Sequence, residues 1–443
     1  MRPRGRASSS LAATAAATPE GRDRLVDLVR AASILVVALG HWTMAALEPR
    51  PDGGIRVRNI LEVTPWAHVL TWVFQVMPLF FFAAGFTTAL ALRRRRRTWS
   101  EFAASRLARV LAPTVTFVGV WLVLSWLLVR AGVPAPLVDS AGDAAAMPLW
   151  FLAVFLLLAV VAPAQHALHS RRPWLLVATL PVVALLLDQV QGTAFAPLGY
   201  LNYLVVFGFC QELGFLYADG ALVRARRRWW LLATLGALGS LVLLTGPGPY
   251  PVSMLGLPGQ DVSKMLPPSV CVIAVALVQL GLVMLARPAL VGWLDRPRVW
   301  QATVAANAFV VTVFLWHITG FVLAAGAAYL TGLPLPPVGS GRWWLEKPLW
   351  IVSAAAVTAG LVALFGRVER GVAGTGTAPD RWGGATTLLA VAGLTMVACA
   401  GFANPLERSG IALAGVTFTP AAGAGLLVGA WLISRVGVRP RRQ

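Results

Sequence analysis

An arginine and a histidine lie inside the first long apolar run of the chain, where ionisable side chains are costly and usually serve a function. Arg30 and His41 are eleven residues apart in the stretch DLVRAASILVVALGHW. On an α-helix this spacing is about three turns and a rise of about 16 Å, so both side chains lie on one stripe. A histidine can act as a general base near neutral pH, and the planar fork of an arginine suits phosphate oxygens. We expect the two residues to form a catalytic site.

Both residues also have a structural explanation. Arg30 could extend toward the cytoplasmic interface and pair with Asp27, which lies one helical turn before it. The helical neighbours of His41 offer no polar partner, so the partner must come from another helix or from a ligand. A structural hydrogen bond between helices is the alternative to a catalytic role for His41.

Two further arginines could hold an anionic group. Arg106 and Arg109 are three residues apart at the start of the third apolar run, so they share a helical face. They could bind phosphates, or they could only add positive charge beside the arginine run at 93–97. Weaker candidates are polar residues of later runs, namely His317, Asn307, Glu212 with Gln211, and Asp188.

The composition places these residues in a membrane protein. Of the 443 residues, 58% are hydrophobic and only 12% are charged, whereas a soluble domain needs about a quarter. Apolar runs of about 18 residues or more, long enough to cross a bilayer, recur along the chain. We therefore expect an all-α polytopic fold. Twelve spans are predicted, at 25–47, 66–92, 107–130, 147–166, 174–190, 199–218, 229–246, 268–286, 302–330, 347–366, 385–402 and 410–434.

The net charge of +19 comes mostly from arginine clusters between apolar runs. That placement is typical of cytoplasmic loops and not of a nucleic-acid surface, so no nucleic-acid partner is expected. It predicts that both termini are cytoplasmic and that the chain lies in the plasma membrane, with lipid as its surroundings. The three cysteines each lie inside a separate apolar run, which favours helix packing over a disulfide or a metal site.

The domain organisation follows from composition. Residues 1–21 are predicted to form a disordered cytoplasmic tail, and residues 22–370 a core of ten spans. The sequence GVAGTGTAPDRWGG at 371–384 reads as a flexible connector. Residues 385–443 would then be a two-span appendage with a basic tail.

An arginine, ten intervening residues and a histidine on the first span resemble the hallmark of the acyltransferase-3 family of integral membrane acyltransferases. The resemblance covers roughly residues 24 to 366. Four further fragments resemble the family in the same order: MPLFFFAAGF (77–86), SRLARVLAP (105–113), MPLWFL (147–152) and FLWHI (314–318). One departure is Ala84, where the family often has a small polar residue, and the last two spans are additional to a ten-helix fold.

The resemblance implies an O-acyltransferase with no bound cofactor and with acyl-CoA, such as acetyl-CoA, as a cytoplasmic co-substrate. The acceptor would be a hydroxyl on a carbohydrate, an envelope component or another small molecule. His41 would be the general base or the nucleophile, assisted by Arg30, and Arg106 and Arg109 would bind the donor. The fragments MPLWFL and FLWHI add Trp150 and His317 as possible site residues, and Asn307 and Glu212 are possible site residues because they are polar residues within predicted spans.

Two other functions compete with this one. A secondary transporter also commonly has twelve spans and intramembrane charges, but the sequence shows no repeat between its halves and no paired broken helices. A glycosyl-transfer or polymer-assembly enzyme would need an acidic cluster to bind a metal and a sugar nucleotide, and none is apparent. We therefore expect an acyltransferase.

Overall fold

The computed structural model describes residues 22–49, 55–94, 98–191, 193–256, 267–373, 382–402, 404–413 and 416–436. The predicted tail (1–21), most of the connector (371–384) and the end of the basic tail lie outside these ranges. Within them the chain is almost entirely helical, and ten helical segments are long and apolar enough to cross a membrane. The protein is therefore an all-α polytopic membrane protein, as the sequence predicts.

Helices occur at all twelve predicted positions, but two are shorter than a full span. These are α8 (Leu175–Asp188, 14 residues) and α17 (Pro420–Val436, 17 residues). The predicted span at 410–434 was wrong in its first part, because β3 (Ser409–Leu413) and β4 (Val416–Phe418) precede the helix as an antiparallel pair.

Two of the predicted spans are interrupted and are not single continuous helices. The span at 66–92 divides into the 3₁₀ helix η2 (Pro65–Leu70), α3 (Thr71–Phe74) and α4 (Met77–Arg94). Pro78 therefore lies in the first turn of α4, where proline is tolerated, and does not kink a longer helix. The span at 302–330 divides into α13 (Pro297–Asn307) and α14 (Val310–Leu330).

The described chain consists of two compact units, each built from three separate segments. The first contains residues up to Val37, 66–91 and 165–310, and the second contains residues 38–65, 92–164 and from 311 onward. Helices α2 (Arg24–Met44), α4 and α7 (Leu149–Arg171) each contribute residues to both units.

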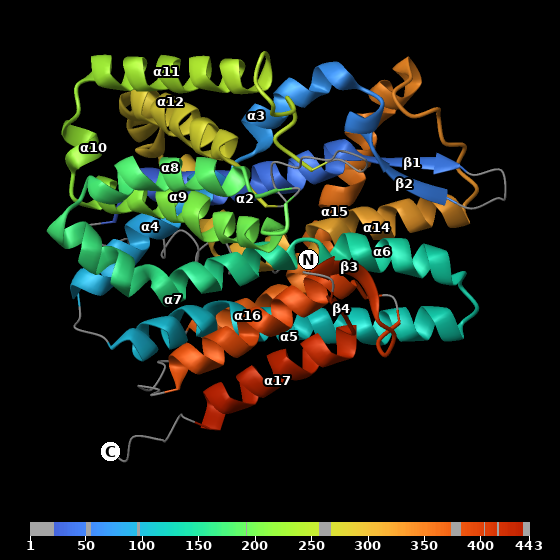
Figure 1. Cartoon of the computed structure of the whole chain (residues 1–443). Coiled ribbons are helices and arrows are strands. Elements are labelled where there is room, and N and C mark those ends of the chain that lie inside the picture. Colours follow the sequence, from blue (N-terminus) through green and yellow to red (C-terminus); the bar gives the residue numbers. More distant parts are fainter. Residues whose placement is uncertain are drawn as a thin grey trace. The chain divides into compact units, whose positions relative to one another are not determined.

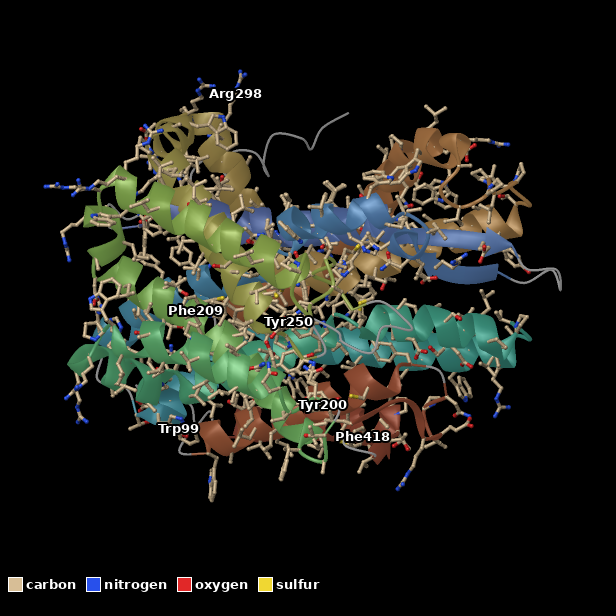
Figure 2. All side chains as sticks on the ribbon, turned by 45° about the horizontal axis from the view of Figure 1, so that its top comes forward. Trp99, Tyr200, Phe209, Tyr250, Arg298 and Phe418 are labelled. Atoms are coloured by element: carbon tan, nitrogen blue, oxygen red, sulfur yellow. The ribbon has the colours of Figure 1, made fainter. Side chains whose placement is uncertain are left out.

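The first unit is a helical bundle in which α11 lies along α12 and α8 lies along α9 (Figure 1). Arg298, at the start of α13, is exposed and points away from the helices (Figure 2). Of the helices just named, α9 is Asn202–Ala218, α11 is Arg227–Thr245 and α12 is Val270–Leu294. The unit also contains η3 (Ala196–Leu201) and α10 (Ala221–Arg224).

Helices α4 and α9 approach closely at two glycines. A Cβ atom added at Gly85 would collide with the carbonyl oxygen of Gln211, and one added at Gly214 would collide with the carbonyl oxygen of Phe82. Small residues allow membrane helices to come this near. Gly85 is the closing glycine of the MPLFFFAAGF fragment, so this part of the fragment serves packing.

The second unit is organised around α5 (Trp99–Arg130), which begins with a capping box between Thr98 and Glu101. Helices α15 (Gly341–Ala373), α16 (Gly383–Ala400) and α17 pack against α5. Its other elements are the antiparallel strands β1 (Ala45–Pro49) and β2 (Ile55–Asn59), the 3₁₀ helix η1 (Ile60–Glu62), and α6 (Ala135–Ala146).

The last two helices make intimate contact with α5. The ring of Phe402, just after α16, stacks on Trp121 with a centroid separation of 5.7 Å and meets Phe117 edge-on at 5.8 Å. Gly384 donates its backbone N–H to the Ser100 hydroxyl. That the core folds without these helices stays a prediction.

Candidate active site

A pair of histidines lies within the second unit. Nδ1 of His41, on α2, is 2.8 Å from Nε2 of His317, on α14, and the two rings stack with centroids 5.0 Å apart. His317 is fully buried, whereas His41 is only partly buried. The structure therefore gives His41 the partner from another helix that its apolar neighbours cannot supply.

The proton positions in this pair follow from a backbone carbonyl. Nδ1 of His317 lies 2.6 Å from the carbonyl oxygen of Phe314, which can only accept a hydrogen bond. Nδ1 of a neutral His317 therefore carries the hydrogen, and its Nε2 accepts one from Nδ1 of His41. This leaves the lone pair of His41 on Nε2, for which the described residues provide no hydrogen-bond partner. A neutral pair thus presents one basic nitrogen.

Several contacts hold α14 and with it His317. Glu369 accepts hydrogen bonds from the backbone N–H groups of Val311 and Thr312, so a carboxylate caps the positive end of the helix. The Trp42 indole donates to the carbonyl oxygen of His317 over 2.8 Å. The Trp121 indole donates to the Thr319 hydroxyl over 3.0 Å. The histidine pair is therefore set on braced elements.

A second cluster, centred on Arg30, lies within the first unit. Nε of Arg30 donates to Oδ1 of Asn307 over 2.6 Å, and a terminal nitrogen of Arg30 is 3.2 Å from Asp27. The Asn307 amide nitrogen donates in turn to the backbone carbonyl oxygen of Asp27. Arg22 also pairs with Asp27, whose side chain is buried. The ion pair required by the structural explanation of Arg30 is present.

Asn307 and His317 contact different residues of α2 and lie on different helices. Both residues fall within the single predicted span at 302–330. In the structure α13 ends at Asn307 and α14 begins at Val310. Asn307 contacts Arg30 in the first unit, and His317 contacts His41 in the second.

The predicted donor-binding arginines differ in exposure. Arg106 is buried, with its guanidinium 5.1 Å from the centre of the Phe102 ring, whereas Arg109 is exposed. Although they are three residues apart on α5, they do not share one environment. Trp150 is half-buried, and its neighbour Phe151 is the residue that packs on Phe314, at 4.7 Å between ring centroids.

Glu212 belongs to another polar cluster, in the first unit. Its carboxylate is fully buried and lies 2.5 Å from Nδ1 of His169, whose Nε2 is 2.9 Å from Asp219. Gln165 donates to the same carboxylate over 2.9 Å. His169 lies just beyond the end of the predicted span at 147–166, yet it is buried. Its spacing of four from Gln165 was the available signal of a polar helical face.

The chain matches a known protein family over most of its length. Residues 24–367 match the model described as an acyltransferase domain. Searches of curated proteins and of solved structures gave no significant match. The matched range includes Arg30, His41 and His317 and ends before α16, in agreement with the extent of the resemblance found in the sequence.

Proposed function

Because the chain belongs to the acyltransferase-3 family of integral membrane acyltransferases, we propose that it transfers an acyl group from cytoplasmic acyl-CoA to a hydroxyl group. The protein is a multi-pass membrane acyltransferase. We propose acetyl as the acyl group that it transfers. For the acceptor we propose a carbohydrate, an envelope component or another small molecule. The predicted plasma-membrane location and cytoplasmic termini are part of this proposal.

The histidine pair supports a general-base mechanism. Nε2 of His41 would take the proton of the acceptor hydroxyl as its oxygen attacks the thioester carbonyl carbon. The carbon–oxygen bond forms, the carbon–sulfur bond breaks, and the departing thiolate of CoA takes the proton from Nε2. His317 would stabilise the transient His41 imidazolium, because its Nε2 accepts the hydrogen of His41 Nδ1.

The same geometry is compatible with a second route. Nε2 of His41 could attack the thioester itself and form an acyl-histidine that the acceptor then cleaves. Both routes need an unprotonated Nε2 and a hydrogen on Nδ1, which the contact with His317 favours. Acyl transfer to protein in the absence of acceptor would identify the second route.

Donor binding is proposed for arginines near the predicted cytoplasmic ends of their helices. Arg30 lies eleven residues before His41 on α2, a rise of about 16 Å along one helix. A donor held there by its phosphates could extend its acyl end along the helix toward His41. Arg106 and Arg109 are proposed for the same donor.

The transporter alternative is weaker. The two interrupted spans remove one sequence argument against a transporter, since broken helices are common in that class. Non-helical backbone is also tolerated wherever protein surrounds it, so interruption does not identify a transporter. The family match over residues 24–367 favours the acyltransferase.

Purified protein in detergent with acetyl-CoA labelled in the acyl group provides the test. We expect thioester cleavage that rises when hydroxyl acceptors are added, with the label found on the acceptor. If no acceptor raises cleavage, and reconstituted protein instead drives proton-coupled solute uptake, the proposed function is wrong. The observation that carries the proposal is the partly exposed His41 whose Nδ1 is held by His317.

A further inference from the structure

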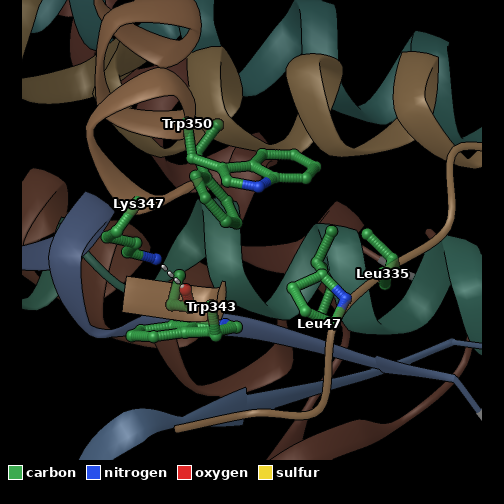
Figure 3. A pocket seen from close by; sticks show the side chains of 8 residues that line it. Leu47, Leu335, Trp343, Lys347 and Trp350 are labelled. Atoms are coloured by element: carbon green, nitrogen blue, oxygen red, sulfur yellow. Dashed lines mark hydrogen bonds between the residues drawn. The ribbon is translucent and has the colours of Figure 1, made fainter. Parts of the chain in front are cut away.

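A pocket lies in the second unit, between β1, α14 and the start of α15 (Figure 3). The space between its side chains measures about 270 Å³ with open solvent included, and only a small part of it is enclosed. The residues that matter here are Ala45, Leu47, Phe321, Trp343, Lys347 and Trp350. The pocket thus has aromatic walls and one charged group, which is the make-up of a small-molecule site.

The pocket lies one helical turn beyond the histidines. Ala45 is the first residue after α2 and follows His41 by four residues, and Phe321 follows His317 by four residues on α14. Four residues of helix rise about 6 Å. Trp42 contributes to both places, because it binds the His317 carbonyl oxygen and packs in the hydrophobic cluster with Leu47 and Phe321. In the predicted orientation this end of α2 faces outward, away from the donor.

Lys347 is a buried cation with little to offset its charge. It is 5% exposed, and its Nζ donates to the backbone carbonyl oxygen of Ala45 over 2.5 Å. The ammonium also lies 4.5 Å from the centre of the Trp343 ring and 5.6 Å from that of Phe321. Figure 3 shows the amine between Trp343 and Trp350. An ammonium group has three donors, and the described residues accept one of them.

The neighbouring carboxylates are engaged elsewhere. Glu346, next to Lys347 in sequence, pairs with Arg342. Glu48, on β1, pairs with Arg58. Within the described ranges no carboxylate pairs with Lys347. Burial of a charge without a counter-charge is costly, so an anion bound in the pocket would offset that cost.

We propose that this pocket binds the acceptor through an anionic group, a carboxylate or a phosphate, held by Lys347 against the aromatic walls. The inference rests on the proposed function, since it names the acceptor class of that enzyme. A flat face of the acceptor would pack on Trp343 or Trp350, and the anion would accept hydrogen bonds from the ammonium. The acceptor hydroxyl would then lie one turn away, beside Nε2 of His41.

Binding can be tested apart from the reaction. The thermal unfolding midpoint of purified protein in detergent, without acyl donor, would be followed with glucuronate, glucose 6-phosphate or glucose. These probes share a sugar ring and differ in the anion. We expect glucuronate or glucose 6-phosphate to raise the midpoint and glucose to raise it much less. Equal effects of all three would overturn the proposal. So would stabilisation by phosphatidylglycerol alone, since the anion would then belong to lipid.

Variants assign the anion selectivity to Lys347. In Lys347→Met, which keeps a long side chain, the preference for the anionic probe over glucose should fall about tenfold or more, whereas Lys347→Arg should keep most of it. Arg342→Met is the control, because Arg342 is an exposed cation on the same helix whose side chain pairs with Glu346. An unchanged preference in Lys347→Met would refute the proposal. If Lys347→Met does not fold, the comparison of the three probes on the wild-type protein tests the proposal instead.

The two proposals fail in different ways. Anion-selective binding that depends on Lys347, without any acyl transfer, would contradict the enzyme function and leave the pocket assignment intact. Acyl transfer to neutral acceptors with no preference for anionic ones would contradict the pocket assignment and leave the enzyme function intact.

Discussion

The carbonyl oxygen of Phe314 lies 2.6 Å from Nδ1 of His317 and so determines which nitrogen of that ring carries the hydrogen. Through the contact between His317 and His41, it also directs the lone pair of His41 to Nε2. The basicity of the site therefore depends on a backbone group three residues from His317.

Replacement of His41 is the first prediction. His41→Gln keeps some hydrogen bonding but removes the base, so acyl transfer should fall by about 10² to 10⁴-fold while acyl-CoA binding changes little. In the wild type, transfer should decrease at low pH, because a protonated imidazole cannot accept the acceptor proton. Rates across a pH series would check both points. His68→Gln, outside the histidine pair, is the matched control, and normal transfer by His41→Gln would exclude His41 from the reaction.

Replacement of His317 should have a smaller and different effect. His317→Gln can still contact His41 but no longer fixes one orientation of its hydrogen, so we expect kcat to fall by about tenfold to a hundredfold. The KM for acyl-CoA should stay nearly constant, because His317 would contact neither substrate. Steady-state kinetics with varied donor would measure the two constants. A loss confined to KM would show that His317 binds the donor instead.

The donor-binding arginines can be separated by their exposure. Arg109→Ala removes an exposed side chain, so the fold should tolerate it and the KM for acyl-CoA should rise with little change in kcat. Arg106→Ala should also weaken donor binding, but it removes a buried side chain and should lower thermal stability as well. Donor titrations and thermal unfolding would be compared. Unchanged donor binding in both variants would assign these arginines to membrane orientation alone.

Sidedness can be checked at two exposed positions. Thr331, after α14, is predicted to be outside, and Val223, in α10, is predicted to be cytoplasmic. In intact cells a membrane-impermeant thiol reagent should therefore label Thr331→Cys and not Val223→Cys. The unmodified protein, with Cys210 and Cys271 buried, gives the background. The reverse labelling pattern would place both termini, and the proposed donor side, on the outside.

The role of the last two helices can be tested by truncation after Arg370. The shortened protein should insert and keep its thioester chemistry, since the histidine pair and Glu369 remain. It should unfold at a lower temperature, because Trp121 and Phe117 lose their contact with Phe402. Failure to insert at all would mean that α16 and α17 are needed for the core to form.

The sequence predicted the membrane class and the helix positions well, because an apolar run long enough to cross a bilayer is a local property. It could not predict the interruption between α13 and α14, since no proline or glycine marks the break at Ala308 and Phe309. The partner of His41 remained open because it lies on a helix that is distant in sequence. Lys347 was overlooked because the predicted span began there, and only tertiary packing shows that β1 and the aromatic rings cover it.

The glycine contact between α4 and α9 changes how a mutational screen of this protein should be interpreted. Any side chain at Gly85 would meet the backbone of Gln211, so every substitution there should separate two helices. An inactive Gly85 variant would then report lost packing, even though the residue lies in a fragment that resembles a family signature. Activity data at this position therefore require a parallel measure of folding before they can be assigned to chemistry.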